Sequence, residues 1–170
     1  MQLLAPYLPH ALGTISLTYL AEHLDFLICK TFGNYQTIDL LGFSMGGVIS
    51  RIWLQTLNGA ARTRRFLSIG SPQQGTLTAQ CIPSWMFAGI ADMKIGSPLL
   101  RSLDAHTNKL DGVRCTSLFC RWDLIVLPGW KAVLPCGEWY SVPVLTHQQL
   151  IYHPIALNLI KRILRSSDKD

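Results

Sequence analysis

A serine set between glycines, where two hydrophobicity patterns meet, constrains this chain most. The apolar run Thr37-Ile38-Asp39-Leu40-Leu41 ends at Gly42 and predicts a buried parallel strand. Apolar side chains then recur at helical spacing over residues 45–57, and Asn58-Gly59 marks the end of that helix. Between the two segments lies Gly42-Phe43-Ser44-Met45-Gly46-Gly47. The sequence therefore predicts a strand, a sharp turn at Ser44 and a helix.

The pattern Gly-x-Ser-x-Gly in this setting is typical of a nucleophilic serine. Serine attacks a carbonyl group only when a base accepts its proton and donors stabilise the charge that forms. Glycines beside the serine remove Cβ atoms that would clash in a sharp turn, and the N-terminus of the following helix favours negative charge. A turn of the same shape without chemistry is the alternative interpretation.

A nucleophilic serine of this kind is followed along the chain by an acid and then by a histidine. Asp123 comes directly after a predicted strand, at the sheet edge where catalytic residues gather. His147 follows the apolar run 142–145 by one residue and is favoured over His153, which precedes Pro154 at a helix start. The alternatives are a turn-capping aspartate and a surface loop histidine.

The rest of the chain alternates between strand and helix patterns, which predicts an α/β fold with a parallel sheet. Residues 75–104 break the alternation, because their apolar side chains show no period and prolines and glycines interrupt them. They predict either an excursion from the sheet or irregular core. The other expected elements are short strands at 2–5, 65–70, 115–120 and 142–145 and helices at 15–32 and 154–165.

Composition excludes several classes of protein. Hydrophobic residues make up 49% and charged residues 15% of the 170 residues, which argues against disorder. No apolar run approaches the roughly 20 residues of a transmembrane segment. The net charge of +5 is spread over small clusters without interleaved aromatic residues. We therefore expect no nucleic-acid partner, and a weak attraction to an anionic membrane is the alternative role of these charges.

The five cysteines form neither an even disulfide framework nor two pairs at zinc-ligand spacing. We expect no metal, no cofactor and a reducing environment. The first basic residue is Lys30, so the basic start of a signal peptide is missing from this sequence. These observations predict a cytoplasmic location.

Four motifs, in the expected order, resemble those of small microbial triacylglycerol lipases and related α/β-hydrolases. Residues 38–47 resemble the family's nucleophile turn. Ser71-Pro72-Gln73-Gln74-Gly75-Thr76 is similar to the family's "SPHxGT" stretch, with Gln73 where histidine is usual. Residues 123–128 are similar to its "DxxVxP" acid loop. The family's histidine segment is matched by His147, Leu150 and Pro154.

The resemblance implies one α/β-hydrolase-like domain over residues 1–170, with a mostly parallel sheet and helices on both faces. It implies that Ser44 attacks an ester carbonyl, that His147 moves the protons, and that Asp123 orients His147. The backbone N–H of Met45 is then one oxyanion donor, and water releases the acyl group. The expected substrates are triacylglycerol-type lipids and other carboxylic esters.

Residues 76–104 occupy the position of a lid or acyl-binding flank, and ordinary irregular core is the alternative. Phe43, Trp85 and Phe87 are the candidate substrate contacts, and transient contact with a lipid surface is expected there. Such a flank is one source of the high mean hydropathy of +0.25. The other source is a sheet that lacks a covering strand.

The chain departs from this family before Ser44. The family has an earlier strand and a His-Gly oxyanion loop, but only 43 residues precede Ser44 here, and neither His10 nor His23 is followed by glycine. We therefore expect the sheet to lack its N-terminal strands and the site to lack its second oxyanion donor. The alternative functions are an inactive fragment or non-catalytic binding module, and an acyltransferase or thioesterase.

Overall fold

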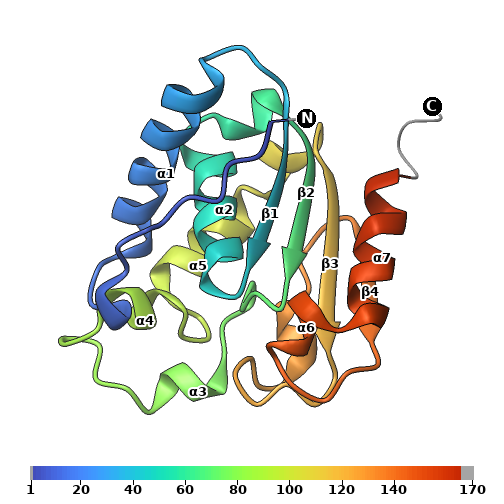
Figure 1. Ribbon diagram of the computed structural model, residues 1–170. Coiled ribbons are helices and arrows are strands. Elements are labelled where there is room, and N and C mark those ends of the chain that lie inside the picture. The colour runs from blue at the N-terminus through green and yellow to red at the C-terminus, as the bar shows by residue number, and fades with distance from the viewer. Residues whose placement is uncertain (1, 166–170) are drawn as a thin grey trace.

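The computed structural model describes residues 2–165 as a parallel sheet with helices packed against it (Figure 1). The strands are β1 (Ile38–Phe43), β2 (Thr63–Ile69), β3 (Arg114–Cys120) and β4 (Glu138–Val142). The α-helices are α1 (Leu17–Phe32), α2 (Met45–Thr56), α3 (Leu77–Gln80), α4 (Ala88–Asp92), α5 (Pro98–Ala105), α6 (Gln149–Tyr152) and α7 (Pro154–Arg165). Short 3-10 turns are η1 (Ala11–Gly13), η2 (Gly59–Arg62), η3 (Thr107–Leu110) and η4 (Gly129–Ala132).

Within residues 2–165, four strands form one sheet in the order β1-β2-β3-β4. All three neighbouring pairs are parallel, and the register sets Phe43 beside Ile69 and Ile69 beside Leu118. Because the strands run the same way, their carboxyl ends meet at one edge. The segments that follow the strands therefore lie next to one another there.

Helices α1, α2 and α5 cover one face of the sheet (Figure 1). Helix α1 presents a stripe of buried side chains at helical spacing, and Ser16 caps its first turn. The largest buried member of this cluster is Trp53 of α2, whose indole N–H donates to Asp25 of α1 over 2.8 Å. Burying these apolar side chains stabilises the helices against the sheet by about 1.5–3 kcal/mol each.

Helix α7 covers the opposite face. Its Ala156 and Ile160 pack against Leu67 of β2 and Leu118 of β3. Pro154 stands at the first helical position, where its missing N–H costs nothing. The expected α/β class, with a parallel sheet and helices on both faces, is confirmed.

Several expected elements differ from the structure. The fourth strand is Glu138–Val142 instead of 142–145, because Pro143 has no N–H for the ladder and Val144 N–H turns back to Val142 O over 2.8 Å. The strand expected at residues 2–5 is absent, and this segment pairs with no strand among residues 2–165. Strand β1 is an edge strand there and leaves Leu41 47% exposed, so it is not the buried strand expected.

Residues 75–104 form an excursion with short helices α3, α4 and α5. The buried Arg51 of α2 attaches to the end of this segment and to the residues just before it. Arg51 Nη2 forms an ion pair with Asp104 of α5 over 2.8 Å, and Nη1 donates to the carbonyl of Gln73 over 3.2 Å. Its Nε donates to Gln55 over 3.0 Å, so each nitrogen of the buried guanidinium has an acceptor. No helix within residues 2–165 is both long enough and apolar enough to cross a membrane.

Candidate active site

Ser44 occupies the tight turn between β1 and α2 with φ 54° and ψ −130°. A positive φ is unfavourable for a residue with a side chain, and such strain collects at functional sites. The surrounding structure holds the turn, because Ser44 N–H donates to Ile69 O of β2 over 2.9 Å. Ser44 thus sits at the carboxyl end of β1, directly before the first turn of α2.

Close packing beneath the turn explains two of its glycines. A Cβ on Gly42 would lie 2.4 Å from the Cα of Gly47, and a Cβ on Gly47 would lie 1.9 Å from Ser71 Oγ. A Cβ on Gly46 would meet open space. The contact that requires glycine on the helix side is therefore at Gly47, one residue beyond the Gly-x-Ser-x-Gly pattern.

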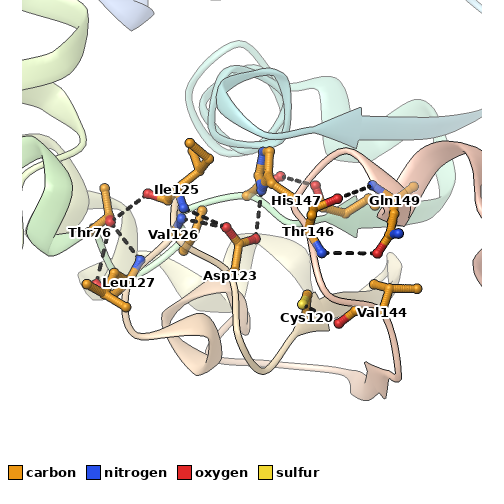
Figure 2. A network of polar contacts seen from close by, with 12 residues as sticks. Thr76, Cys120, Asp123, Ile125, Val126, Leu127, Val144, Thr146, His147 and Gln149 are labelled. Carbon is orange, nitrogen blue, oxygen red and sulfur yellow. Dashed lines mark hydrogen bonds and ion pairs between the residues drawn. The ribbon is translucent and has the colours of Figure 1, made fainter.

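Asp123 and His147 form a buried pair at the same edge of the sheet (Figure 2). His147 Nδ1 lies 2.7 Å from Asp123 Oδ2, and the two residues are 5% and 1% exposed. Asp123 follows β3 and His147 follows β4, so parallel strand ends bring together two residues 24 positions apart. The structure thus joins the two residues that the sequence singled out as acid and histidine.

The Asp123 carboxylate is held by its own loop. Oδ1 accepts the backbone N–H groups of Ile125 over 2.8 Å and Val126 over 3.0 Å. Burial by itself would raise the pKa of Asp123, but the hydrogen bonds from His147, Val126 and Ile125 outweigh it and lower the pKa. Asp123 is therefore ionised at neutral pH, and its Oδ2 must accept a proton from His147 Nδ1. This arrangement leaves His147 Nε2 as the unprotonated nitrogen of the neutral ring.

The other side of the His147 ring faces the ends of β1 and β2. The Phe43 ring, next to Ser44 in the chain, lies 4.7 Å from the His147 ring between centroids and is tilted by 35°. A Cβ on Gly70 would lie 3.1 Å from His147 Cε1, so glycine is needed there for close approach. His147 Nε2 is buried and has no hydrogen-bond partner within residues 2–165. A buried ring nitrogen without a partner is uncommon, because most buried polar atoms form a hydrogen bond.

A capped turn fixes the position of His147. Thr146 N–H donates to Gln149 Oε1 over 3.1 Å, and Gln149 N–H donates to Thr146 Oγ1 over 3.4 Å. These reciprocal bonds are those of a capping box at the start of a helix (Figure 2). Sequence reasoning missed Gln149 as a supporting residue, although the spacing Thr146-His147-Gln148-Gln149 carries the signal.

Segment 76–104, the expected flank, begins beside the acid loop and ends in α5, where Asp104 pairs with Arg51 of α2. Leu77 N–H at the start of α3 donates to Leu127 O over 2.9 Å. Trp85 is 83% exposed, whereas Phe87 is partly buried just before α4, which packs against α1 and α5. Neither Trp85 nor Phe87 takes part in a ring contact or hydrogen bond that joins it to Ser44 or His147 within the described part of the chain.

The acid loop itself exposes apolar side chains, which the sequence did not predict. Leu124 is 77% exposed, and Ile125, Leu127 and Trp122 are exposed as well. Asp123 itself is only 1% exposed, although these apolar neighbours along the chain face outward. Together with the region around Trp85, these exposed side chains contribute to the high mean hydropathy of the chain.

The N–H of Met45 lies in the first turn of α2, where N–H groups have no acceptor within the helix and attract negative charge. Among residues 2–165, no group of three His, Cys, Asp or Glu side chains is placed to hold a metal ion. At this edge of the sheet, Ser44, the Asp123–His147 pair and the first backbone N–H groups of α2 follow the ends of β1, β3 and β4.

Solved structures of lipases and of an α/β-hydrolase share the fold of this chain. The mature form of Bacillus licheniformis lipase BlEst2 matches with a TM-score of 0.69 and 16% identity over 88% of this chain and 74% of its own length. Aspergillus fumigatus lipase B matches with a TM-score of 0.72 and 18% identity over 90% of this chain. The α/β-hydrolase MGS-MChE2, from a lagoon-sediment metagenome, matches with a TM-score of 0.61 and 18% identity over 96% of this chain and 77% of its own.

The sequence adds the particular family. A model of the palmitoyl protein thioesterase family matches residues 16–114, more than half of the 170 residues, and the chain belongs to this family. No curated protein matches the sequence. This chain spans only 42% of the length of the Aspergillus lipase. The expected α/β-hydrolase family is confirmed, and the narrower resemblance to triacylglycerol lipases stays a prediction.

Proposed function

We propose that this chain is a serine hydrolase that cleaves carboxylic esters through an acyl-enzyme. Ser44 Oγ attacks the ester carbonyl, and His147 Nε2 takes the Ser44 proton and gives it to the departing alcohol. Asp123 holds His147 in the required tautomer and stabilises its charged form. A water molecule, activated by the same histidine, then releases the acid and restores Ser44.

The buried, unpartnered Nε2 of His147 carries this proposal. It belongs to a ring whose other nitrogen is bound by an ionised carboxylate, and the ring lies against Phe43, next to Ser44. These features support a general-base role, because a base needs an unprotonated nitrogen and a partner that fixes its ring. The strained backbone of Ser44 supports the nucleophile role independently.

In this proposal the Met45 N–H stabilises the oxyanion of the tetrahedral intermediate. The His-Gly loop that supplies a second donor in the family resembled has no counterpart among residues 2–165. Activated esters, whose leaving groups depart readily, are suitable first substrates because they need the least stabilisation of the transition state.

Thioesters are the second candidate substrates, and the palmitoyl protein thioesterase match over residues 16–114 favours them. The same three side chains would attack a thioester carbonyl and release a thiol. A comparison of kcat/KM for p-nitrophenyl butyrate and butyryl coenzyme A separates the two candidates. A preference of tenfold or more for the coenzyme A ester would replace the ester proposal with the thioester one.

We propose that the acyl group of the substrate binds to the apolar side chains along the sheet edge. Triacylglycerol-type lipids are the candidate substrates. Segment 76–104 is the proposed lid or acyl-binding flank, and its Trp85 is well placed for transient contact with a lipid surface because it is 83% exposed. Trp85→Ala is expected to raise KM for p-nitrophenyl decanoate and leave KM for p-nitrophenyl acetate unchanged. Equal effects on both esters would exclude the flank role.

The function is tested by ester hydrolysis with a matched serine control. Ser44→Ala is expected to lower kcat on p-nitrophenyl butyrate by at least about a thousandfold, because removing the nucleophile disables the whole triad. Ser102→Ala, on the exposed face of α5, is expected to leave kcat unchanged. Wild-type protein that neither hydrolyses the ester nor reacts with a fluorophosphonate would instead support the inactive-module alternative.

We also propose a reducing, cytoplasmic location, which the cysteines support. All five are free, and Cys115 and Cys136 remain so although they pack in the same apolar cluster. Cells are lysed in denaturant, the thiols are alkylated, and the mass of the intact protein is measured. We expect five alkyl groups per chain. A lower count would indicate disulfides and an oxidising compartment.

A further inference from the structure

One peptide group links the Asp123 carboxylate to segment 76–104 (Figure 2). The peptide between Ile125 and Val126 has its N–H on Asp123 Oδ1 over 3.0 Å. The carbonyl of this peptide, on Ile125, accepts the hydroxyl of Thr76 over 3.0 Å and that of Thr78 over 2.7 Å. The two threonines therefore bind the carbonyl of this peptide, and its N–H binds the Asp123 carboxylate.

Each of the two hydroxyls has one proton to donate. Thr78 Oγ1 lies 2.7 Å from the Ile125 carbonyl oxygen, and Thr76 Oγ1 lies 2.9 Å from Thr78 Oγ1, 3.0 Å from the Ile125 oxygen and 3.4 Å from Leu127 O. Both hydroxyls therefore support the same carbonyl, Thr78 directly and Thr76 directly or through Thr78. Thr76 Oγ1 in turn accepts Leu127 N–H over 2.9 Å, which binds the loop on the far side of the same peptide. Thr76 is 5% exposed, so water does not readily replace these bonds, whereas Thr78 is exposed.

Hydrogen bonds at the two ends of a peptide group strengthen each other. Donors on a carbonyl polarise the amide, and its N–H then becomes a better donor. The chain of bonds runs from the hydroxyls through peptide 125–126 to Asp123 Oδ1, and from Asp123 Oδ2 to His147 Nδ1. Neither threonine forms a hydrogen bond with His147 within residues 2–165, so an effect on the base is carried by the acid loop, through this peptide and through Leu127.

We propose that Thr76 and Thr78 are positioning residues that fix the Asp123–His147 pair through the peptide between Ile125 and Val126. The inference rests on the proposed serine hydrolase function and deepens it. Thr76 also begins segment 76–104: its N–H donates to Met93 O over 3.0 Å, and its side chain caps α3. The position of the proposed flank and the alignment of the proposed base are thus set by the same side chain.

The experiment compares threonine variants that keep or remove the hydroxyl. Thr76→Val keeps the shape and removes the hydroxyl, Thr76→Ser keeps the hydroxyl, and Thr78→Val removes the second donor to the same carbonyl. Thr63→Val is the matched control, because Thr63 is also buried and its hydroxyl donates to a backbone carbonyl over 2.8 Å at the opposite end of β2. Each variant is measured for kcat and KM on p-nitrophenyl butyrate and for thermal unfolding.

Thr76→Val is expected to lower kcat about tenfold with KM unchanged, because its hydroxyl acts on the base and not on the substrate. Thr76→Ser should restore kcat to within twofold of wild type. Thr78→Val alone should lower kcat by less. The fold decrease in kcat of the double variant should exceed the product of the two single decreases, because either hydroxyl alone can still bind the Ile125 carbonyl. Thr63→Val should change neither kcat nor KM.

A second readout does not depend on turnover. The low-field proton NMR signal of the His147–Asp123 hydrogen bond should broaden or disappear in Thr76→Val and persist in Thr76→Ser and Thr63→Val. The positioning role would be overturned if folded Thr76→Val kept both the wild-type signal and the wild-type kcat. If Thr76→Val fails to fold, the same result in Thr78→Val would overturn it. If Ser44→Ala also retained wild-type activity, the proposed function itself would fail, so the two failures are distinguishable.

Discussion

Replacing Asp123 by asparagine tests the geometry of the site most stringently, because the structure dictates how the new amide must point. Asp123 Oδ1 accepts two backbone N–H groups, from Ile125 and Val126. An amide nitrogen in that place would face two donors and have no acceptor. In Asp123→Asn the amide oxygen must therefore occupy the Oδ1 position, and the NH₂ group must face His147 Nδ1.

That orientation inverts the histidine tautomer. With a donor 2.7 Å away, Nδ1 must accept, so the proton of the neutral ring moves to Nε2. Nε2 then has no lone pair for the Ser44 proton, although no atom of the site has moved. A wrong tautomer of this kind lowers kcat by about ten-thousandfold in serine hydrolases with this triad.

The assay is kcat for p-nitrophenyl butyrate, with thermal unfolding to show that the variant is folded. Asp111→Asn, on the exposed side of η3, is the control and should behave as wild type. If Asp123→Asn kept more than about a tenth of the wild-type kcat, the carboxylate would not set the tautomer of a catalytic histidine. The argument from the two backbone donors would then be refuted.

Substitutions at three further places test the packing and the charges. Gly47→Ala should destabilise the fold by more than about 2 kcal/mol in urea unfolding because its methyl overlaps a side chain, whereas Gly46→Ala should change stability by less than about 1 kcal/mol. Asp104→Ala should cost about 3 kcal/mol by leaving the buried Arg51 without its ion-pair partner, and Arg51→Met should cost less, since Asp104 is half exposed and can be hydrated. Burial would raise the pKa of Asp39, but hydrogen bonds and ion pairs with Arg64 and Arg65 lower it to about 2. The ionised Asp39 should therefore stabilise the fold above pH 4, and this stabilisation should fall as the pH drops toward 2. Asp39→Asn should lack this pH dependence of the free energy of unfolding.

The parts of the fold that sequence reasoning predicted well are those coded by local pattern. Helix 154–165 begins at the proline and ends where expected, and the strand before Ser44 runs into its turn and helix as the apolar pattern indicates. Ser44, Asp123 and His147 were chosen as residues that follow strands, and the parallel sheet brings the carboxyl ends of those strands to one edge. The structure adds the direct contact between Asp123 and His147.

Features that depend on distant contacts were not predictable from local pattern. Gly47 is constrained by Ser71, which lies 24 positions further along, and the motif points to Gly46 instead. The role of Thr76 depends on the Ile125 carbonyl, 49 positions away. The fourth strand was misplaced because β4 alternates apolar and polar side chains weakly, while the apolar run after it is interrupted by Pro143.

Covalent labelling of Ser44 reports whether the buried Asp123–His147 pair activates this serine. A fluorophosphonate is incubated with wild type and with His147→Ala, and the adduct is mapped by peptide mass spectrometry. We expect one adduct per chain on Ser44 in wild type and labelling slower by at least about a thousandfold in His147→Ala. An adduct on another residue, or equal labelling rates in the two proteins, would contradict this activation.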